Sequence, residues 1–150
     1  MKKILSLGLA LLLIIIGGIS ALAEDGSNVL DGCSAWAKEE IVSAIELGFV
    51  PQELQSDYKK TITRQEFAKI AIYFSAMQYN CDVEDYYTLY CKYYKKVDPA
   101  YIEYNAFDDC SDYFVVQARE TDMVSGIGNN FFHPNRDITR QESAVMLENA

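Results

Sequence analysis

The sequence predicts an all-α protein that is built from tandem helix-loop-helix repeats. Two observations lead to this prediction. The segment Ile62–Glu66, which reads ITRQE, recurs 76 residues later as Ile138–Glu142. Apolar residues after the first copy recur at intervals of three, four and seven residues, the spacing of a helix with one buried face. A segment repeated in this way indicates a supersecondary unit that the chain uses more than once.

Residues 1–23 are typical of a secretory signal peptide. Lys2 and Lys3 form a basic start, an apolar run extends to Ile16, and 21–23 read Ala-Leu-Ala, the small-x-small pattern that a signal peptidase accepts. The apolar run is short for a membrane span, so an uncleaved anchor is the less favoured alternative. We therefore expect a secreted protein with no stable membrane span after cleavage.

The chain as a whole is acidic and rich in aromatic residues. Lys and Arg total 13 against 22 for Asp and Glu, which gives a net charge of −9. A strongly acidic chain lacks the basic face that a phosphate backbone requires, which argues against nucleic-acid binding. The 7 Phe, 11 Tyr and 1 Trp supply enough large apolar surface to drive folding.

Four cysteines are present, and an even number in an exported protein favours disulfides. Three pairings are possible, and the sequence does not choose among them, although a helix-loop-helix unit that returns near its start favours Cys33 with Cys81 or Cys91. No CxxC spacing occurs, and the single histidine, His133, is distant from every cysteine, so we expect no metal site. The disulfide candidates are Cys33, Cys81, Cys91 and Cys110.

The first helix of the first repeat is expected to follow Trp36. Ala37, Ile41 and Ala44 fall on one face of this helix, and Gly48 stands where a left-handed C-cap is needed. In the second repeat, Asp122 takes the place of Gly48. The first helix of the second repeat is four residues shorter, about one helical turn, so the buried face stays in phase.

The second helix of each repeat begins with a capping box. Thr63 with Glu66, and Thr139 with Glu142, have the spacing in which each side chain satisfies a free backbone N–H of the other residue. The apolar stripe that follows the first box consists of Phe67, Ile70, Ala71 and Phe74.

Arginine occupies the first helical position after each cap, as Arg64 and Arg140. The helix dipole is positive there, so an exposed cation costs about 0.3–1 kcal/mol. Together with the free N–H groups, such an arginine forms a place for an anion. The alternative is a salt bridge to a neighbouring acid, and the sequence leaves both alternatives open.

These patterns resemble the S-layer homology domain, the wall-anchoring repeat of bacterial surface proteins. That family has an aspartate ahead of a tryptophan-alanine pair, a glycine-hydrophobic step, and a Thr-Arg-Ala-Glu signature, in which Gln65 and Gln141 here replace the alanine. The matching residues are Asp31, Trp36, Ala37, Gly48, Phe49 and Thr63–Glu66 in the first repeat, and Phe107, Asp109, Gly126, Gly128, Phe132, Pro134 and Thr139–Glu142 in the second.

The resemblance implies the organisation of the chain. Residues 24–76 form the first repeat, 77–106 a tyrosine-rich linker, and 107–150 a second repeat that stops partway through its last helix. Three such repeats usually assemble into one pseudo-threefold unit. Self-association with another chain would complete a third repeat; otherwise that repeat is absent because the chain is truncated.

The resemblance also implies a function. It implies non-covalent binding to an anionic secondary cell-wall polysaccharide, of the pyruvylated glycan class, at the surface of a bacterium. The signature arginines would meet the anionic group, and the aspartate and tryptophan would shape the groove. The implied ligand-binding residues are Arg64, Arg140, Asp31, Trp36, Asp109, Gly126 and Gly128.

The linker 77–106 holds eight tyrosines and three nearby lysines, Lys92, Lys95 and Lys96. Rings at this density form a carbohydrate-stacking platform, a protein contact surface, or simply packing for the two repeats, the last being favoured.

No nucleophile constellation, HExxH, GxSxG or phosphate loop is present, so we expect neither an enzyme nor a cofactor. The predicted function is a non-catalytic envelope-anchoring module. The alternatives are the N-terminal targeting part of a longer secreted hydrolase and a surface protein-protein adaptor.

Overall fold

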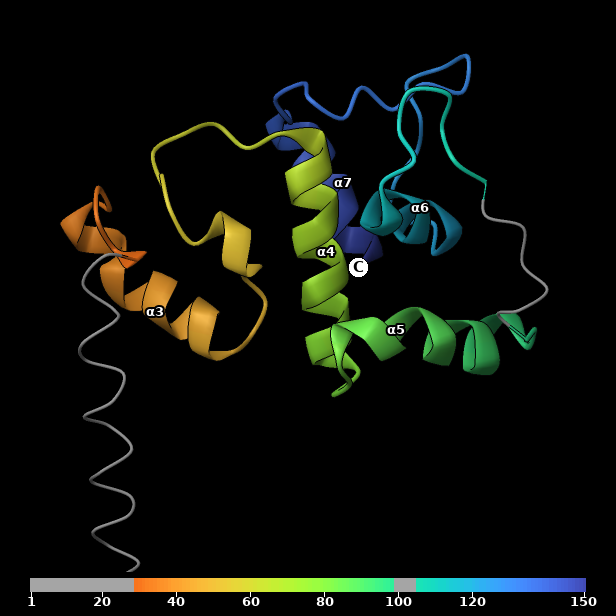
Figure 1. The fold of residues 1–150 in the computed structure, drawn as a ribbon, viewed down its shortest axis with the longest axis horizontal. Helices are drawn as coiled ribbons and strands as arrows, with labels where there is room; N and C mark the ends of the chain where they lie inside the picture. The colour runs from red at the N-terminus through yellow and green to blue at the C-terminus, as the bar shows by residue number, and fades with distance from the viewer. Residues whose placement is uncertain (1–28, 99–104) are drawn as a thin grey trace, which may run out of the picture.

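A computed structural model of the protein describes residues 29–98 and 105–150 (Figure 1). The predicted signal peptide, 1–23, lies outside the described residues. The described part contains five α-helices and no β-strand, which confirms the all-α class. The helices are α3 (Lys38–Glu46), α4 (Arg64–Gln78), α5 (Val83–Tyr90), α6 (Tyr113–Glu120) and α7 (Arg140–Asn149), with short 3-10 turns at Ala35–Ala37 and Gln52–Leu54 and a π-helical turn at Cys91–Lys95.

The two copies of the repeated segment share their local backbone geometry. Asp57 and His133, 76 residues apart in the sequence, both have a positive φ, at 51° and 58°. Each accepts a hydrogen bond from the backbone N–H three residues later, at 2.7 Å from Lys60 and 3.2 Å from Arg136. The turn before α4 and the turn before α7 therefore have the same construction.

The ends of the two first helices also correspond. Gly48 and Asp122 adopt the left-handed conformation, with φ of 80° and 62°, at the C-terminal ends of α3 and α6. The next N–H returns to an alanine carbonyl in both cases, from Phe49 to Ala44 at 3.3 Å and from Met123 to Ala118 at 2.8 Å. This is the helix stop expected from the sequence, with glycine in one repeat and aspartate in the other.

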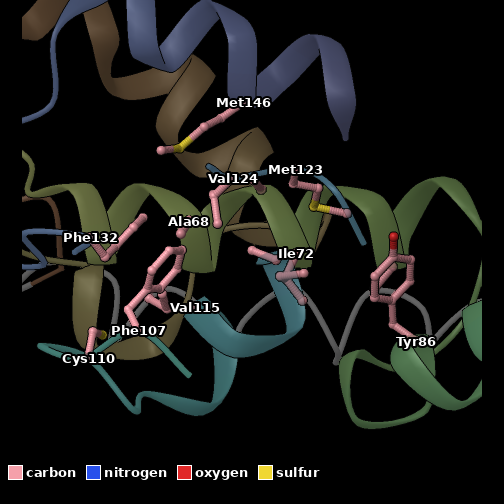
Figure 2. Close-up of a cluster of buried hydrophobic side chains, with 13 residues drawn as sticks. Ala68, Ile72, Tyr86, Phe107, Cys110, Val115, Met123, Val124, Phe132 and Met146 are labelled. Atoms are coloured by element: carbon pink, nitrogen blue, oxygen red, sulfur yellow. The ribbon is translucent and has the colours of Figure 1, made fainter. Parts of the chain in front are cut away.

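The core surrounds α4, which packs against α5, α6 and α7 (Figures 1 and 2). Ala68, Ala71 and Ile72 of α4 are fully buried, so the buried face is rotated from the expected stripe: of that stripe only Ala71 is fully buried, and Phe67 packs at the edge of the core. Full burial of an aliphatic side chain such as Ile72 contributes about 1.5–3 kcal/mol. The other elements contribute Tyr86, Phe107, Val115, Ala118, Met123, Phe132 and Met146 to the same cluster.

Helix α3 lies to one side of this core (Figure 1). None of its residues is buried, and Trp36, in the turn that precedes it, is 83% exposed. The expected apolar face is therefore buried in α6, whereas in α3 the expected residues, Ile41 and Ala44 among them, form the inner face but are only half-buried. The reason is visible in the packing, because α6 packs mainly on α4, the second helix of the other repeat.

The tyrosine-rich segment folds as a helix and a π-helical turn. Tyr86 and Tyr87 are buried, as expected for rings that pack on the repeats, whereas Tyr93 and Tyr94 are 63% and 58% exposed. The Tyr90 and Tyr94 rings stack at 5.4 Å between centroids. Tyr101 and Tyr104 lie outside the described residues.

All four cysteines are free thiols in the structure. Cys91 and Cys110 are buried, while Cys33 and Cys81 are partly exposed. No two of them are at disulfide distance, because they sit on separate elements, and neither preferred partner of Cys33 is brought to it. Oxidation of these cysteines stays a prediction from the export signal. Of the described helices, none has the length and apolar character needed to cross a membrane.

Candidate functional site

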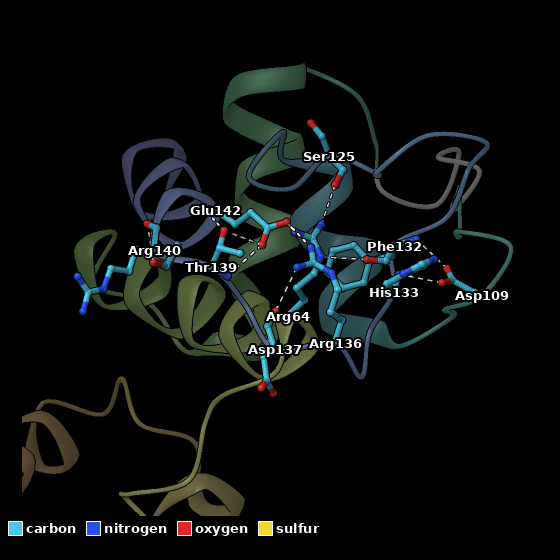
Figure 3. Close-up of polar contacts among 11 residues, drawn as sticks. Arg64, Asp109, Ser125, Phe132, His133, Arg136, Asp137, Thr139, Arg140 and Glu142 are labelled. Carbon is cyan, nitrogen blue, oxygen red and sulfur yellow. Dashed lines mark hydrogen bonds and ion pairs between the residues drawn. The ribbon is translucent and has the colours of Figure 1, made fainter.

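The candidate site is the region where the N-termini of α4 and α7 meet (Figure 3). The segments that precede the two helices run antiparallel, with the N–H of Ile138 donating to the Ile62 carbonyl at 3.1 Å. The Thr61 hydroxyl also donates to the Asp137 carboxylate at 3.1 Å. This pairing brings together the starts of two helices whose first residues, Arg64 and Arg140, are 76 residues apart in the sequence.

Both capping boxes that the sequence predicts are present. The Thr63 hydroxyl accepts from the N–H of Glu66 at 3.3 Å, and the Glu66 carboxylate accepts from the N–H of Thr63 at 2.7 Å. The same two bonds join Thr139 and Glu142, at 3.2 Å and 3.0 Å. The caps fix where α4 and α7 begin, and therefore which residue holds the first helical position.

Arg64 is buried at this junction, with 3% of its surface exposed. Its Nε donates to the Phe132 carbonyl at 2.9 Å, and Nη2 donates to the Ser125 carbonyl at 3.1 Å. Its Nη1 pairs with Glu142 at 2.5 Å. The guanidinium also lies 4.6 Å from the centroid of the Phe132 ring. Of the two alternatives for Arg64, the structure shows the salt bridge, and a polymer has no access to this side chain.

Glu142 is the acid that joins the two repeats. It accepts from Arg64 and, at close range, from Arg136, while its other oxygen completes the cap of α7. Burial opposes ionisation of this carboxyl group, but donation from Arg136 and Thr139 and the charge of Arg64 outweigh it and lower its pKa to about 2. Glu142 is therefore charged at every physiological pH.

Arg140 holds the same position in α7 that Arg64 holds in α4, but its side chain is exposed. Within the described residues, its guanidinium makes no hydrogen bond or ion pair, and it points away from the Arg64 cluster (Figure 3). Its own backbone carbonyl accepts from the Ser143 hydroxyl at 3.0 Å, which belongs to the first turn of α7. The side chain is thus an available cation at a capped helix N-terminus.

Asp109 holds the loop that covers Arg64. Its two carboxylate oxygens accept from the backbone N–H groups of Phe132 and His133, each at 2.8 Å. Desolvation acts in the opposite direction, but these donors keep the pKa of Asp109 below its ordinary value. Asp31, its counterpart in the first repeat, is exposed and has no such partners among the described residues.

Gly126 and Gly128 shape the same loop. A Cβ on Gly126 would lie 2.9 Å from the Phe131 carbonyl oxygen, and Gly128 has a φ of 113°, which disfavours other residues. Both line a polar groove of about 560 Å³ together with Lys95, Arg119 and Asn130. The structure therefore explains these glycines by backbone geometry and places them at the edge of a groove.

Trp36 and Asp31 do not join Arg64 or Arg140 in one site, because they precede α3, which lies apart from the junction. Sequence reasoning missed Arg136, Ser125 and Phe132 as partners of the junction. The one signal was the cluster of acids and arginines around the second capping box. Nothing in the sequence indicated that the Ser125 carbonyl would meet Arg64 from 61 residues away.

No family model, curated protein or solved structure matches the chain. The chemistry of the site is therefore the main guide to function. Across residues 29–98 and 105–150, no group of three or more His, Cys, Asp and Glu side chains is placed to hold a metal ion. The junction contains one buried arginine, Arg64, whose bonds join the two repeats, and one exposed arginine, Arg140, at the start of a helix.

Proposed function

We propose that the protein is a non-catalytic module of a bacterial cell envelope that binds an anionic polysaccharide non-covalently. One observation carries the proposal. Arg140 stands exposed and unpaired within the described chain at the N-terminus of α7, whereas its counterpart Arg64 is fully engaged. The resemblance of the repeats to S-layer homology domains supports a wall polymer of the pyruvylated class as the ligand.

The chemistry at Arg140 suits a carboxylate. A guanidinium presents two parallel N–H donors that match the two oxygens of a carboxylate, such as a pyruvyl group carries. The helix dipole of α7 adds a positive partial charge at the same end. Because the chain as a whole has a net charge of −9, an anionic polymer would be attracted only at a local site of this kind.

The polar groove beside the Gly126–Gly128 loop supports the polysaccharide part of the proposal. It is lined by the amide, hydroxyl and cationic side chains of Asn105, Asn130, Ser125 and Arg119 and by the carboxylates of Glu120 and Asp122. Such groups are the usual hydrogen-bonding partners of sugar hydroxyls. We assign the groove to the neutral part of the polymer and Arg140 to its acidic group.

The second candidate function is a surface adaptor that binds another protein. The exposed rings of Tyr79, Tyr93 and Tyr94, at 46%, 63% and 58%, favour it, because exposed tyrosines are common at protein interfaces.

Sedimentation with purified cell walls tests the polymer proposal. The secreted protein should pellet with intact walls and stay in solution with walls stripped chemically of their anionic polymer. Arg140→Ala should weaken binding about 10- to 150-fold, because a charge-assisted hydrogen bond is worth about 1.5–3 kcal/mol. Arg140→Lys should restore binding only in part, since it keeps the charge and loses the two-pronged geometry.

The matched control is Lys59→Ala, which removes the same charge from another exposed position in the first repeat. Equal pelleting of Arg140→Ala and Lys59→Ala would show that Arg140 does not bind the wall. Equal binding of the wild type to intact and stripped walls would show that the anionic polymer is not the ligand.

A further inference from the structure

The contact between the two repeats has a defined pattern. The first helix of repeat two, α6, packs on the second helix of repeat one, α4, and this is the largest contact between helices in the described chain. The Phe114 ring lies 5.8 Å from the Tyr73 ring and 4.3 Å from the Lys69 ammonium group. The Gln65 side chain donates to the Asp112 carboxylate, the N-cap of α6, at 3.1 Å.

The first repeat presents the same helix start, and within residues 29–98 and 105–150 no helix covers it as α4 covers the start of α6. We name this surface the head: Ser34, Trp36 and helix α3. Trp36 stands five residues after Asp31, as Phe114 stands five after Asp109, and Ser34 stands where repeat two has Asp112. Phe114 is half-buried, yet Trp36 is 83% exposed, and α3 has no buried residue. An exposed indole of this size is an unsatisfied apolar surface.

The second repeat presents the matching helix, α7, and the face that points away from α4 is exposed within the described residues. We name this surface the tail: Gln141, Ala144, Val145, Glu148 and Asn149. Adding the repeat offset to Lys69, Tyr73 and Gln65 gives Val145, Asn149 and Gln141. Val145, at the position of Lys69, is 50% exposed and shares one face of α7 with Gln141 and Asn149, which lie four residues before and after it. Ala144, which corresponds to the fully buried Ala68, is exposed as well.

Two further positions differ between the internal contact and the uncovered surfaces. Glu148 of the tail corresponds to the buried Ile72, and Lys38 of the head takes the place of the buried Val116. The head also carries Glu39, Glu40 and Glu46, so net charge does not distinguish it from the tail. The match between head and tail instead rests on their correspondence to the internal contact of α6 on α4.

We propose that the protein associates head to tail, with the head of one copy packed on the tail of a second copy in the arrangement of α6 on α4. The indole of Trp36 then covers Val145, and Gln141 reaches the Ser34 position. A contact between two different surfaces leaves one free head and one free tail on every pair, so assembly continues beyond two copies unless a ring closes.

This inference goes beyond the proposed polymer binding and does not rest on it. In the internal contact, Arg64 is enclosed by Phe132 and the loop that carries it. In the proposed contact, the first repeat of a second copy carries Ser56 at the position of Phe132 and Glu66 at the position of Glu142. These groups would face Arg140 as their counterparts face Arg64, so association and polymer binding compete for Arg140.

Complementary variants test the proposal. Trp36→Glu blocks the head and Val145→Glu blocks the tail, and both positions are at least half exposed, so folding should be unaffected. Tyr93→Glu, at 63% exposure outside both surfaces, is the matched control. The mass of each secreted protein is measured by light scattering over a range of concentrations up to about 1 mM. A reducing agent is present to prevent bonds between thiols of different copies.

We expect the wild type and Tyr93→Glu to gain mass with concentration, and each blocked variant to remain a single chain. An equimolar mixture of the two blocked variants should form pairs and stop there, because one supplies the only free tail and the other the only free head. A wild type that stays monomeric at every concentration overturns the proposal. So does a mixture that forms no pairs, or loss of association in Tyr93→Glu.

Discussion

The two signature arginines show how one residue type in one local sequence takes two structural roles. Arg64 and Arg140 each follow a capping threonine and precede a Gln-Glu pair. Arg64 is buried because the Ser125 and Phe132 carbonyls and the Glu142 carboxylate come to it from repeat two. Arg140 has no following repeat in the described chain to supply the same groups, so it remains exposed.

Replacement of Arg64 by Ala should therefore lower stability, and should do so far more than the same change at Arg140. It removes an ion pair and two hydrogen bonds at a buried site and leaves two carbonyl groups without their donors. We expect a loss of about 3 kcal/mol, at the low end for a broken buried pair, because Glu142 keeps Arg136 as a partner.

Urea unfolding of Arg64→Ala and Arg140→Ala measures this difference, since the two variants change the same residue type at equivalent helix positions. The Arg140 variant should lie within about 0.5 kcal/mol of the wild type. Similar losses in both would show that the burial of Arg64 contributes nothing to stability.

The Glu142 carboxyl group predicts how stability depends on pH. Its pKa is about 2 in the folded protein against an ordinary 4.5, so it binds protons more weakly when folded than when unfolded. Its contribution is complete above pH 4.5 and is lost as the pH falls toward 2. Glu142→Gln should be less stable than the wild type at pH 7.

The same variant should lose less stability between pH 4.5 and pH 2 than the wild type does, as followed by thermal unfolding at each pH. Other carboxyl groups with lowered pKa values, Glu53, Glu66 and Asp109, remain in both proteins and provide the common background. Parallel pH profiles would exclude Glu142 as a source of acid sensitivity.

At the scale of the element, the beginnings of α4 and α7 are fixed by local chemistry. Both start at the residue after a threonine whose hydroxyl accepts from the N3 backbone N–H, and both glutamates return to the threonine N–H. These bonds satisfy donors that a helix cannot satisfy itself. The same local rule ends α3 at Gly48 and α6 at Asp122, through a left-handed residue.

Removal of either threonine cap should lower the free energy of unfolding by about the same amount. Thr63→Ala and Thr139→Ala should each lower the free energy of unfolding by about 1 kcal/mol, because each leaves one helix N–H without its acceptor. Thr88→Ala, at an exposed position within α5, is the control and should be close to neutral. Chemical denaturation of the three variants provides the comparison, and equal losses in all three would mean that the caps contribute nothing specific.

At the scale of the whole molecule, the core is formed largely by contacts between the two repeats rather than within each of them. α6 packs on the helix of the preceding repeat, the loop of repeat two covers Arg64, and the segments before α4 and α7 pair with each other. α3 is left at one end and the outer face of α7 at the other. This open arrangement is the physical basis of both proposals, since it exposes Arg140 and the two docking surfaces together.

The sequence by itself determined the features that depend on neighbours along the chain. The helical class, the two capping boxes and the left-handed stop at Gly48 all follow from residues within a few positions of one another. Such features are set by backbone donors and apolar spacing, which a sequence displays directly.

Only the tertiary structure decided which residues of each repeat are covered. Asp109 and Asp31 match in sequence, yet one clamps a loop and the other is exposed, and Trp36 is exposed where Phe114 packs. The thiols, too, lie apart from one another despite their even number. The reason is that burial depends on partners brought from 60 to 80 residues away, and within the described chain equivalent positions in the two repeats meet different partners.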